Sequence, residues 1–328
     1  MGGQVNTNMK KIRTTIILLL CVALTLCGCA AGETSRREPV WELTCTQPAA
    51  LSGIYPAGGS KLYICSSDYE AERTTVQLVD AGSDAVCGEV TLDGVWSIKS
   101  QSFSDGRLAL CDRAITLTDT MSADEELYGI NAALDALSRT LSLYPDGFFA
   151  QFKNGMGEGG IRFLLTERID SDYGVVGCAY ESREWQNIAL DVRMADGLDT
   201  IICHELWHAT ENHILLRDYS AFSPDTWAAL NPEGFAYCED PTQSDSMLEW
   251  TLYSSSPDNV YFVDGYSCVN EREDRARIME YFMVHEDEAG LLIESPAIRQ
   301  KLQFMCDAVR NNFDTTGWSA VRWESLLR

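Results

Sequence analysis

The sequence predicts an α+β fold in which a small β-rich region precedes a larger domain with a mixed sheet and a helical C-terminal part. Residues 40–121 contain short alternating apolar stretches, separated by turn sequences rich in Gly, Ser and Asp. From residue 123 onwards, apolar residues instead recur at the spacing of an amphipathic helix. The chain has 328 residues, which is enough for one large domain or two modest ones.

The composition excludes several classes of protein. Hydrophobic residues make up 45% of the chain and charged residues 23%, which excludes wholesale disorder and a protein with many membrane spans. There are 49 Asp and Glu residues against 25 Lys and Arg, so the formal net charge is −24. Because this charge repels phosphate backbones, we expect no nucleic-acid partner.

Residues 1–28 have the features of a lipoprotein signal peptide. Basic residues precede an apolar run at 14–26, which is short for a membrane span of roughly 20 residues. The sequence Leu26-Cys27-Gly28-Cys29 then resembles a bacterial lipobox, whose last Cys receives the lipid. The pattern predicts lipidation of Cys29, a tether at 29–39 and an extracytoplasmic, membrane-anchored location. An uncleaved signal anchor is the alternative.

The β-rich region at 40–121 contains a weak internal repeat. Residues 61–65 resemble residues 107–111, and residues 40–43 resemble residues 95–98. Offsets of this size are typical of propeller blades, so the region is interpreted either as partial blades or as an ordinary β-rich module.

The domain predicted at 122–328 begins with a helix at 123–141, which Pro145-Asp146-Gly147 brings to an end. Strands are expected at 160–165 and 187–192, and a long helix at 198–215. The last third is expected to be mostly helical, with helices at 270–285 and 296–312.

The strongest chemical signal is His204-Glu205-Leu206-Trp207-His208, within the predicted helix at 198–215. Residues four apart share a helix face, so both imidazoles can reach one ion. Neutral His nitrogens are ordinary Zn²⁺ ligands, and Glu205 can take a proton from an activated water. The stretch therefore predicts a catalytic zinc site with Glu205 as the general base.

A catalytic zinc needs a third protein ligand, and the residues alone leave it open. Ile214 stands where the extended metzincin pattern requires a His, which excludes that subclass. His213 points off the ligand face, and His285 lies in an acidic segment. Glu233 lies in a turn between Pro and Gly, where a solvated side chain is favoured.

Glu273 is the remaining candidate for the third ligand. Its spacing from Asn270 also fits a helix N-cap with an acidic N3 residue, and Arg277 lies four residues further on as a possible ion-pair partner. By spacing alone, the ligand and the capping interpretations of Glu273 stand even.

The stretch from Tyr261 to Tyr266, followed by Glu273-Asp274-Arg275-Ala276, resembles the third-ligand region of gluzincin metallopeptidases. It is most similar to the group of anthrax lethal factor and the Pro-Pro endopeptidases, and to uncharacterised zinc-binding peptidase lipoproteins of Gram-positive bacteria. The resemblance covers roughly residues 146–312 and implies a zincin-like domain. It implies that His204, His208 and Glu273 hold Zn²⁺, and that the Tyr266 hydroxyl stabilises the oxyanion.

Arg277 departs from this resemblance, because an acidic residue often lies four positions after the ligand Glu in that group. The departure leaves open which residue supports the ligands.

The sequence therefore predicts a lipid-anchored, zinc-dependent metalloendopeptidase that acts on peptides or proteins. Substrate is expected to lie extended along an edge strand, placed at 187–192. One alternative is a non-catalytic ligand-binding lipoprotein with a relict zinc site, which the intact Glu205 argues against. Another is a zinc hydrolase that acts on something other than peptides, such as peptidoglycan cross-links.

Overall fold

The computed structural model describes most of the chain after residue 49. The described residues are 50–56, 60–98, 110–111, 113–117, 123–154, 156, 158–166, 169, 175–182, 184–194, 196–239, 248–254, 256–319 and 321–328. The predicted signal peptide, Cys29 and the tether at 29–39 lie outside them. The described part is mixed α and β, with six α-helices labelled α2 to α7.

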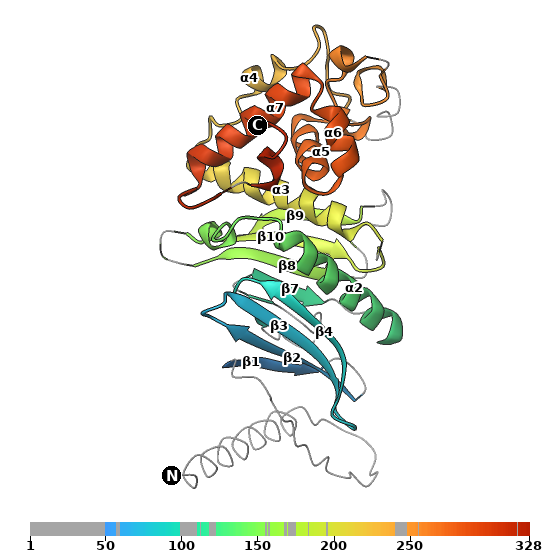
Figure 1. The fold of residues 1–328 in the computed structure, drawn as a ribbon, viewed down its shortest axis with the longest axis vertical. Helices are drawn as coiled ribbons and strands as arrows, with labels where there is room; N and C mark the ends of the chain where they lie inside the picture. The colour runs from blue at the N-terminus through green and yellow to red at the C-terminus, as the bar shows by residue number, and fades with distance from the viewer. Residues whose placement is uncertain are drawn as a thin grey trace.

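The N-terminal strands form a four-stranded antiparallel meander at one end of the molecule (Figure 1). Its strands are β1 (Ala50–Pro56), β2 (Lys61–Asp68), β3 (Arg73–Asp80) and β4 (Ala85–Asp93). Two short strands, β5 (Ser97–Ile98) and β6 (Leu110–Cys111), pair separately. Of the predicted repeat, residues 61–65 lie in β2 and residues 110–111 in β6, whereas residues 40–43 and 107–109 lie outside the described residues.

A second, mixed sheet has the strand order β7-β8-β10-β9. Its strands are β7 (Arg113–Leu117), β8 (Gly160–Thr166), β9 (Gly177–Ser182) and β10 (Trp185–Asp191). β8 pairs in parallel with β7 and with β10, whereas β9 is antiparallel to β10. The second sheet thus begins with β7, ahead of the boundary at residue 121 that the sequence predicted.

The prediction that residues 187–192 form the edge strand is wrong. β10 lies between β8 and β9, and β9 is the edge strand. In β10 the consecutive residues Gln186, Asn187 and Ile188 are all buried, as is typical of a strand covered on both faces. Strand β9 begins with Gly177 and Cys178, and its start lacks the alternating apolar residues by which β10 was predicted.

The long helices lie where the sequence predicted them. They are α2 (Ala123–Leu141), α3 (Leu198–Arg217), α5 (Glu271–Val284) and α7 (Pro296–Asn312). Two short helices, α4 (Pro224–Ala228) and α6 (Glu286–Leu292), were not predicted. None of the helices in the described ranges is both long enough and apolar enough to cross a membrane.

Helix α3 is the centre of the molecule. It packs on β9 and β10 with one side, and on α5 and α7 with the other (Figure 1). Twelve of its 20 residues are buried, including the apolar Ile202 and Leu206 as well as the polar Thr210 and Glu211. A helix with most of its residues buried has little conformational freedom, which makes α3 a rigid support for side chains that carry chemistry.

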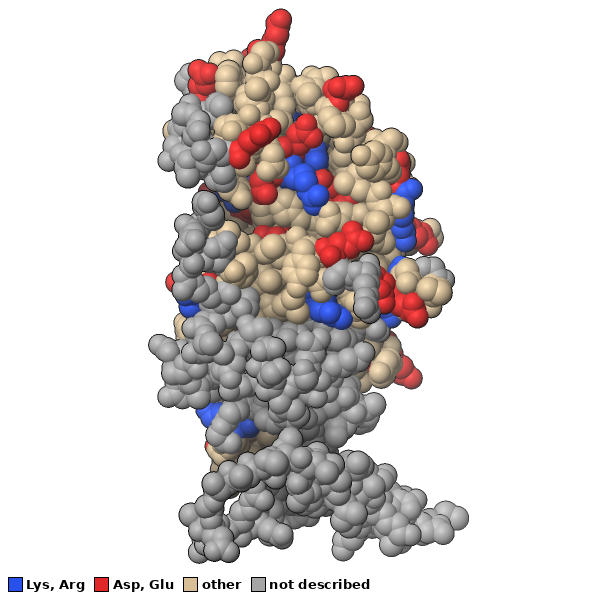
Figure 2. All heavy atoms as spheres, turned by 180° about the vertical axis from the view of Figure 1, so that it is seen from behind, with Lys and Arg blue, Asp and Glu red and all other residues tan. Residues whose placement is uncertain are grey.

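Charged side chains of both signs lie on the described part of the surface that Figure 2 draws. On the face drawn in Figure 2, acidic side chains lie over the described helical part with Lys and Arg side chains among them.

We expect buried His213 to make stability depend on pH. Burial, with a smaller contribution from Arg217, lowers the pKa of His213 to about 4, while its ring packs against Phe152 and Phe313. The unfolded chain therefore binds a proton below about pH 6.5 that the folded chain does not bind until about pH 4. The resulting stability is present above pH 6.5 and is lost as the pH falls.

His213→Phe should remove roughly 1–3 kcal/mol of the drop in unfolding free energy between pH 7 and pH 4. Urea unfolding of both proteins in a chelator, which excludes metal effects, measures this drop. Equal drops in the two proteins would show that His213 is not responsible.

Candidate metal centre

Two helices place the candidate ligands. Helix α3 carries His204 and His208 on one face, one turn apart. Helix α5 begins at Asn270, whose side-chain oxygen accepts hydrogen bonds from the backbone N–H groups of Arg272 and Glu273. This N-cap was predicted, and it puts Glu273 in the first turn of α5, facing α3.

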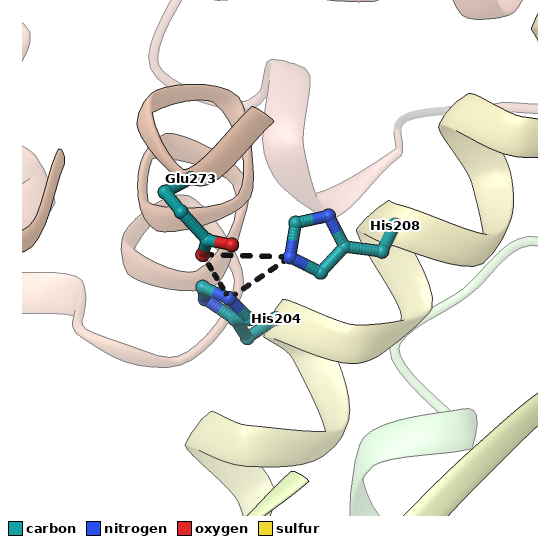
Figure 3. Close-up of side chains that lie close together, drawn as sticks. All are labelled: His204, His208 and Glu273. Atoms are coloured by element: carbon teal, nitrogen blue, oxygen red, sulfur yellow. Dashed lines mark hydrogen bonds and ion pairs between the residues drawn. The ribbon is translucent and has the colours of Figure 1, made fainter. Parts of the chain in front are cut away.

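His204, His208 and Glu273 converge on one point, and these three residues could hold a metal ion (Figure 3). The Nε2 atoms of the two imidazoles lie 3.1 Å apart. Glu273 Oε2 lies 2.9 Å from His204 Nε2 and 3.5 Å from His208 Nε2. Ligand atoms around a tetrahedral ion with 2.0–2.1 Å bonds are about 3.3 Å apart, so the three distances bracket that value.

The orientation of His204 is set by a residue that the sequence analysis did not identify. His204 Nδ1 donates to Glu280 Oε2 over 3.1 Å, and Glu280 is 1% exposed. In a neutral imidazole this bond places the proton on Nδ1, so Nε2 keeps its lone pair for an ion. Glu280 lies seven residues after Glu273, which is two turns along the same face of α5, and this spacing was the available signal.

The pKa values of Glu273 and His204 are shifted because these groups lie close together in a largely buried site. Burial raises the pKa of Glu273, but hydrogen bonds from His204 and His208 outweigh it and hold that pKa well below its usual range. Burial disfavours the charged form of His204, yet its bonds to Glu273 and Glu280 raise its pKa to about 9. A metal ion at this point therefore competes with a proton for His204.

Glu205 points toward the edge strand β9. A Cβ atom added at Gly177 would come within 2.8 Å of Glu205 Oε1, so the missing side chain makes room for this carboxylate. The backbone N–H of Ala179 donates to it as well. Burial is the main cause that raises the pKa of Glu205, as expected of a carboxylate suited to accept a proton near neutral pH.

Tyr266 lies at the edge of the same site. It begins the short 3₁₀ helix Tyr266–Cys268, and its ring centroid is 6.2 Å from that of His204. The residue is 41% exposed. Burial and the nearby charges of Glu273 and Glu205 raise its pKa, which keeps the hydroxyl protonated as a donor.

The other sequence candidates lie elsewhere. Glu233 is exposed in the turn that was expected for it. His213 is enclosed between aromatic rings, and His285 stacks on Tyr281 and lies 3.7 Å from Glu280. Neither Glu233, His213 nor His285 belongs to a metal-binding group among the described residues. The alternative pair of Glu273 with Arg277 is not formed, because Arg277 binds Asp264 and Glu280.

Comparisons of the chain with protein-family models, with curated proteins and with solved structures found no match. The resemblance to gluzincins is therefore carried by the residues named above alone, and a metal at this group is supported by its own geometry.

Two buried ion pairs hold the start of α5 in place beside Glu273. Arg275 donates to Glu211 of α3 over 2.8 and 2.9 Å, and both side chains are almost fully buried. Lys301 of α7 donates to Asp274 over 2.7 Å, and both are fully buried. Glu273 thus lies directly before two residues that are anchored to other helices, which limits the movement of its carboxylate.

Lys301→Met should destabilise the fold by about 3–5 kcal/mol, because it leaves the Asp274 carboxylate buried without its cation. Adding Asp274→Asn should restore part of the loss, since the amide is neutral and can still accept from Tyr237 and Trp227. Urea unfolding of the single and double variants measures both effects. A double variant as unstable as the sum of its two single changes would contradict this coupling.

Proposed function

We propose that the protein is a zinc-dependent metalloendopeptidase. The observation that carries the proposal is the convergence of His204, His208 and Glu273 next to a buried Glu205 that faces an edge strand. Two imidazoles and one carboxylate are typical of catalytic zinc sites, which keep a fourth position for water or substrate. A site with purely structural zinc would have no use for a buried base beside it.

The residues divide the chemistry of peptide hydrolysis between them. Zinc bound by the three ligands would supply Lewis-acid activation of water and of the scissile carbonyl. Glu205 would accept the proton of the attacking water and deliver it to the leaving amine. The Tyr266 hydroxyl would donate to the developing oxyanion. Glu280 would keep His204 in the tautomer that binds the ion.

Strand β9 is the proposed support for the substrate. Its outer side carries no strand among the described residues, so it can pair with an extended peptide. Glu205 reaches the same strand at Gly177 and Ala179, which brings the base close to a peptide bound there. Tyr180 of β9 is 44% exposed and would contact the side chains of such a peptide.

We also propose that the enzyme acts outside the cytoplasmic membrane, anchored through a lipid on Cys29. The support for this part is the N-terminal sequence alone, with its basic start, apolar run and lipobox-like end.

Glu273→Ala should abolish stoichiometric zinc binding, because two His ligands alone leave the site incomplete. Glu233→Ala is the matched control, since Glu233 is also a Glu but is exposed and remote from the group. Zinc content of the purified wild type and of both variants measures the difference. Loss of zinc in Glu233→Ala but not in Glu273→Ala would exchange the two assignments.

Glu205→Gln should retain zinc but lose peptide cleavage by at least about 10²-fold, because the amide cannot accept the proton. A peptide library, digested by wild type and variant and analysed by mass spectrometry, measures this loss. Cleavage by the variant near the wild-type rate would reject Glu205 as the base. A wild type that binds zinc but cleaves no peptide would instead favour a different zinc-dependent substrate.

A further inference from the structure

Arg277 connects two parts of the site that are separate in the sequence. It lies one turn after Glu273 on α5, and its Nε donates to Asp264 Oδ2 over 3.1 Å. Its Nη2 donates to the same oxygen, and its Nη1 donates to the carboxylate of Glu280. Arg277 and Asp264 are 18% and 22% exposed, so solvent screens this network much less than a surface ion pair.

One part of the network, which we call the metal arm, connects Arg277 through Glu280 to the candidate metal ligand His204. Glu280 accepts from Arg277 and, through Oε2, from His204 Nδ1. Because Glu280 is almost fully buried, its charge needs a partner, and Arg277 supplies a positive one. Without that partner the carboxylate would lose the contact that fixes its orientation, and its hold on His204 would weaken.

The other part, which we call the loop arm, connects Arg277 through Asp264 to the Tyr266 loop, by which we mean residues 264–267. Asp264 Oδ1 accepts from the backbone N–H and the hydroxyl of Ser267, both over 3.1 Å, so the loop closes around this carboxylate. Tyr266 lies inside the closed loop. The second oxygen of Asp264 is the one that Arg277 binds, so the guanidinium holds the whole loop against α5.

We propose that Arg277 is a positioning residue that holds the ligand His204, through Glu280, and the Tyr266 loop, through Asp264, in one fixed arrangement. A guanidinium can do this because it presents five donors in a rigid plane, whereas a Lys ammonium is a single point charge. The inference rests on the proposed function, since it requires a metal at the three-residue group. It also gives a role to the residue that departs from the gluzincin resemblance.

The first measurement is the zinc affinity of the purified full chain, by competition with a chromophoric chelator. Arg277→Met and Glu280→Gln should each lower the affinity by about 10–100-fold, as is usual when the support of a ligand His is lost. The two changes together should cost little more than one, because they break one connection. Asp264→Asn should leave the affinity near that of wild type.

The second measurement separates the loop arm from the metal arm. On a peptide that wild type cleaves, with zinc in excess, Asp264→Asn and Arg277→Met should lower kcat with little change in KM. The upper limit is the loss of about 10²–10³-fold that is typical of one oxyanion donor. Arg277→Lys should recover part of the zinc affinity but little of kcat, since it keeps the charge and loses the bridge. Because Arg277→Lys is a conservative change, it also tests the proposal if Arg277→Met folds poorly.

Arg310→Met is the matched control, because Arg310 also makes a two-bonded pair with a Glu, but with Glu324, which is outside the candidate metal group. Zinc affinity in Arg277→Met and Arg277→Lys equal to that of Arg310→Met would overturn the proposal. Equal effects of Asp264→Asn and Glu280→Gln on zinc affinity would overturn it too. If the wild type binds zinc but cleaves no peptide, the peptidase proposal is rejected. The zinc affinities of the variants then still test the role of Arg277. A wild type without zinc rejects both.

Discussion

The contact between α3 and α5 is the interaction on which the candidate site depends. Buried apolar residues of both helices belong to one core, and several charged and polar side chains add directed contacts between them. His204 contacts Glu280, His208 contacts Glu273, and Glu211 contacts Arg275, so the early residues of α3 meet the late residues of α5. Charged contacts of this kind are directional, and they specify how the two helices lie against one another more narrowly than apolar packing does.

Burying these charged groups costs free energy, and each of them has a charged or hydrogen-bonding partner that offsets part of this cost. Moving an unpaired ion into the interior would cost several kcal/mol, whereas a paired and hydrogen-bonded one comes near to break-even. Asp274 illustrates the pattern, because Lys301, Tyr237 and Trp227 all donate to it. The pairs are therefore weak evidence for stability. Their value is geometric, since a ligand displaced by even 1 Å no longer suits a metal ion.

The sequence was sufficient for elements whose signals are local. The spacing of His204 and His208, the N-cap at Asn270 and the apolar period of α2 each depend on residues within two turns of one another. It was insufficient where the answer depends on which elements become neighbours. Residues 187–192 were placed at the sheet edge because nothing in their own pattern shows that β9 pairs beside them. Glu280 was missed for the same reason, because its importance comes from a residue 76 positions away.

Glu273 shows how a local and a non-local interpretation can both hold. Spacing alone made it either a helix-capping residue or a metal ligand. In the structure its backbone N–H serves the cap, while its carboxylate turns away from Asn270 and faces the two imidazoles. The cap fixes where α5 begins, and the fixed start of the helix orients the Glu273 side chain. The capping signal was thus a part of how this candidate ligand is positioned, and the two interpretations do not exclude one another. The same logic extends to Arg277, whose spacing allowed a pair with Glu273 but whose guanidinium binds the carboxylates of Asp264 and Glu280 instead, which leaves the Glu273 carboxylate to the imidazoles.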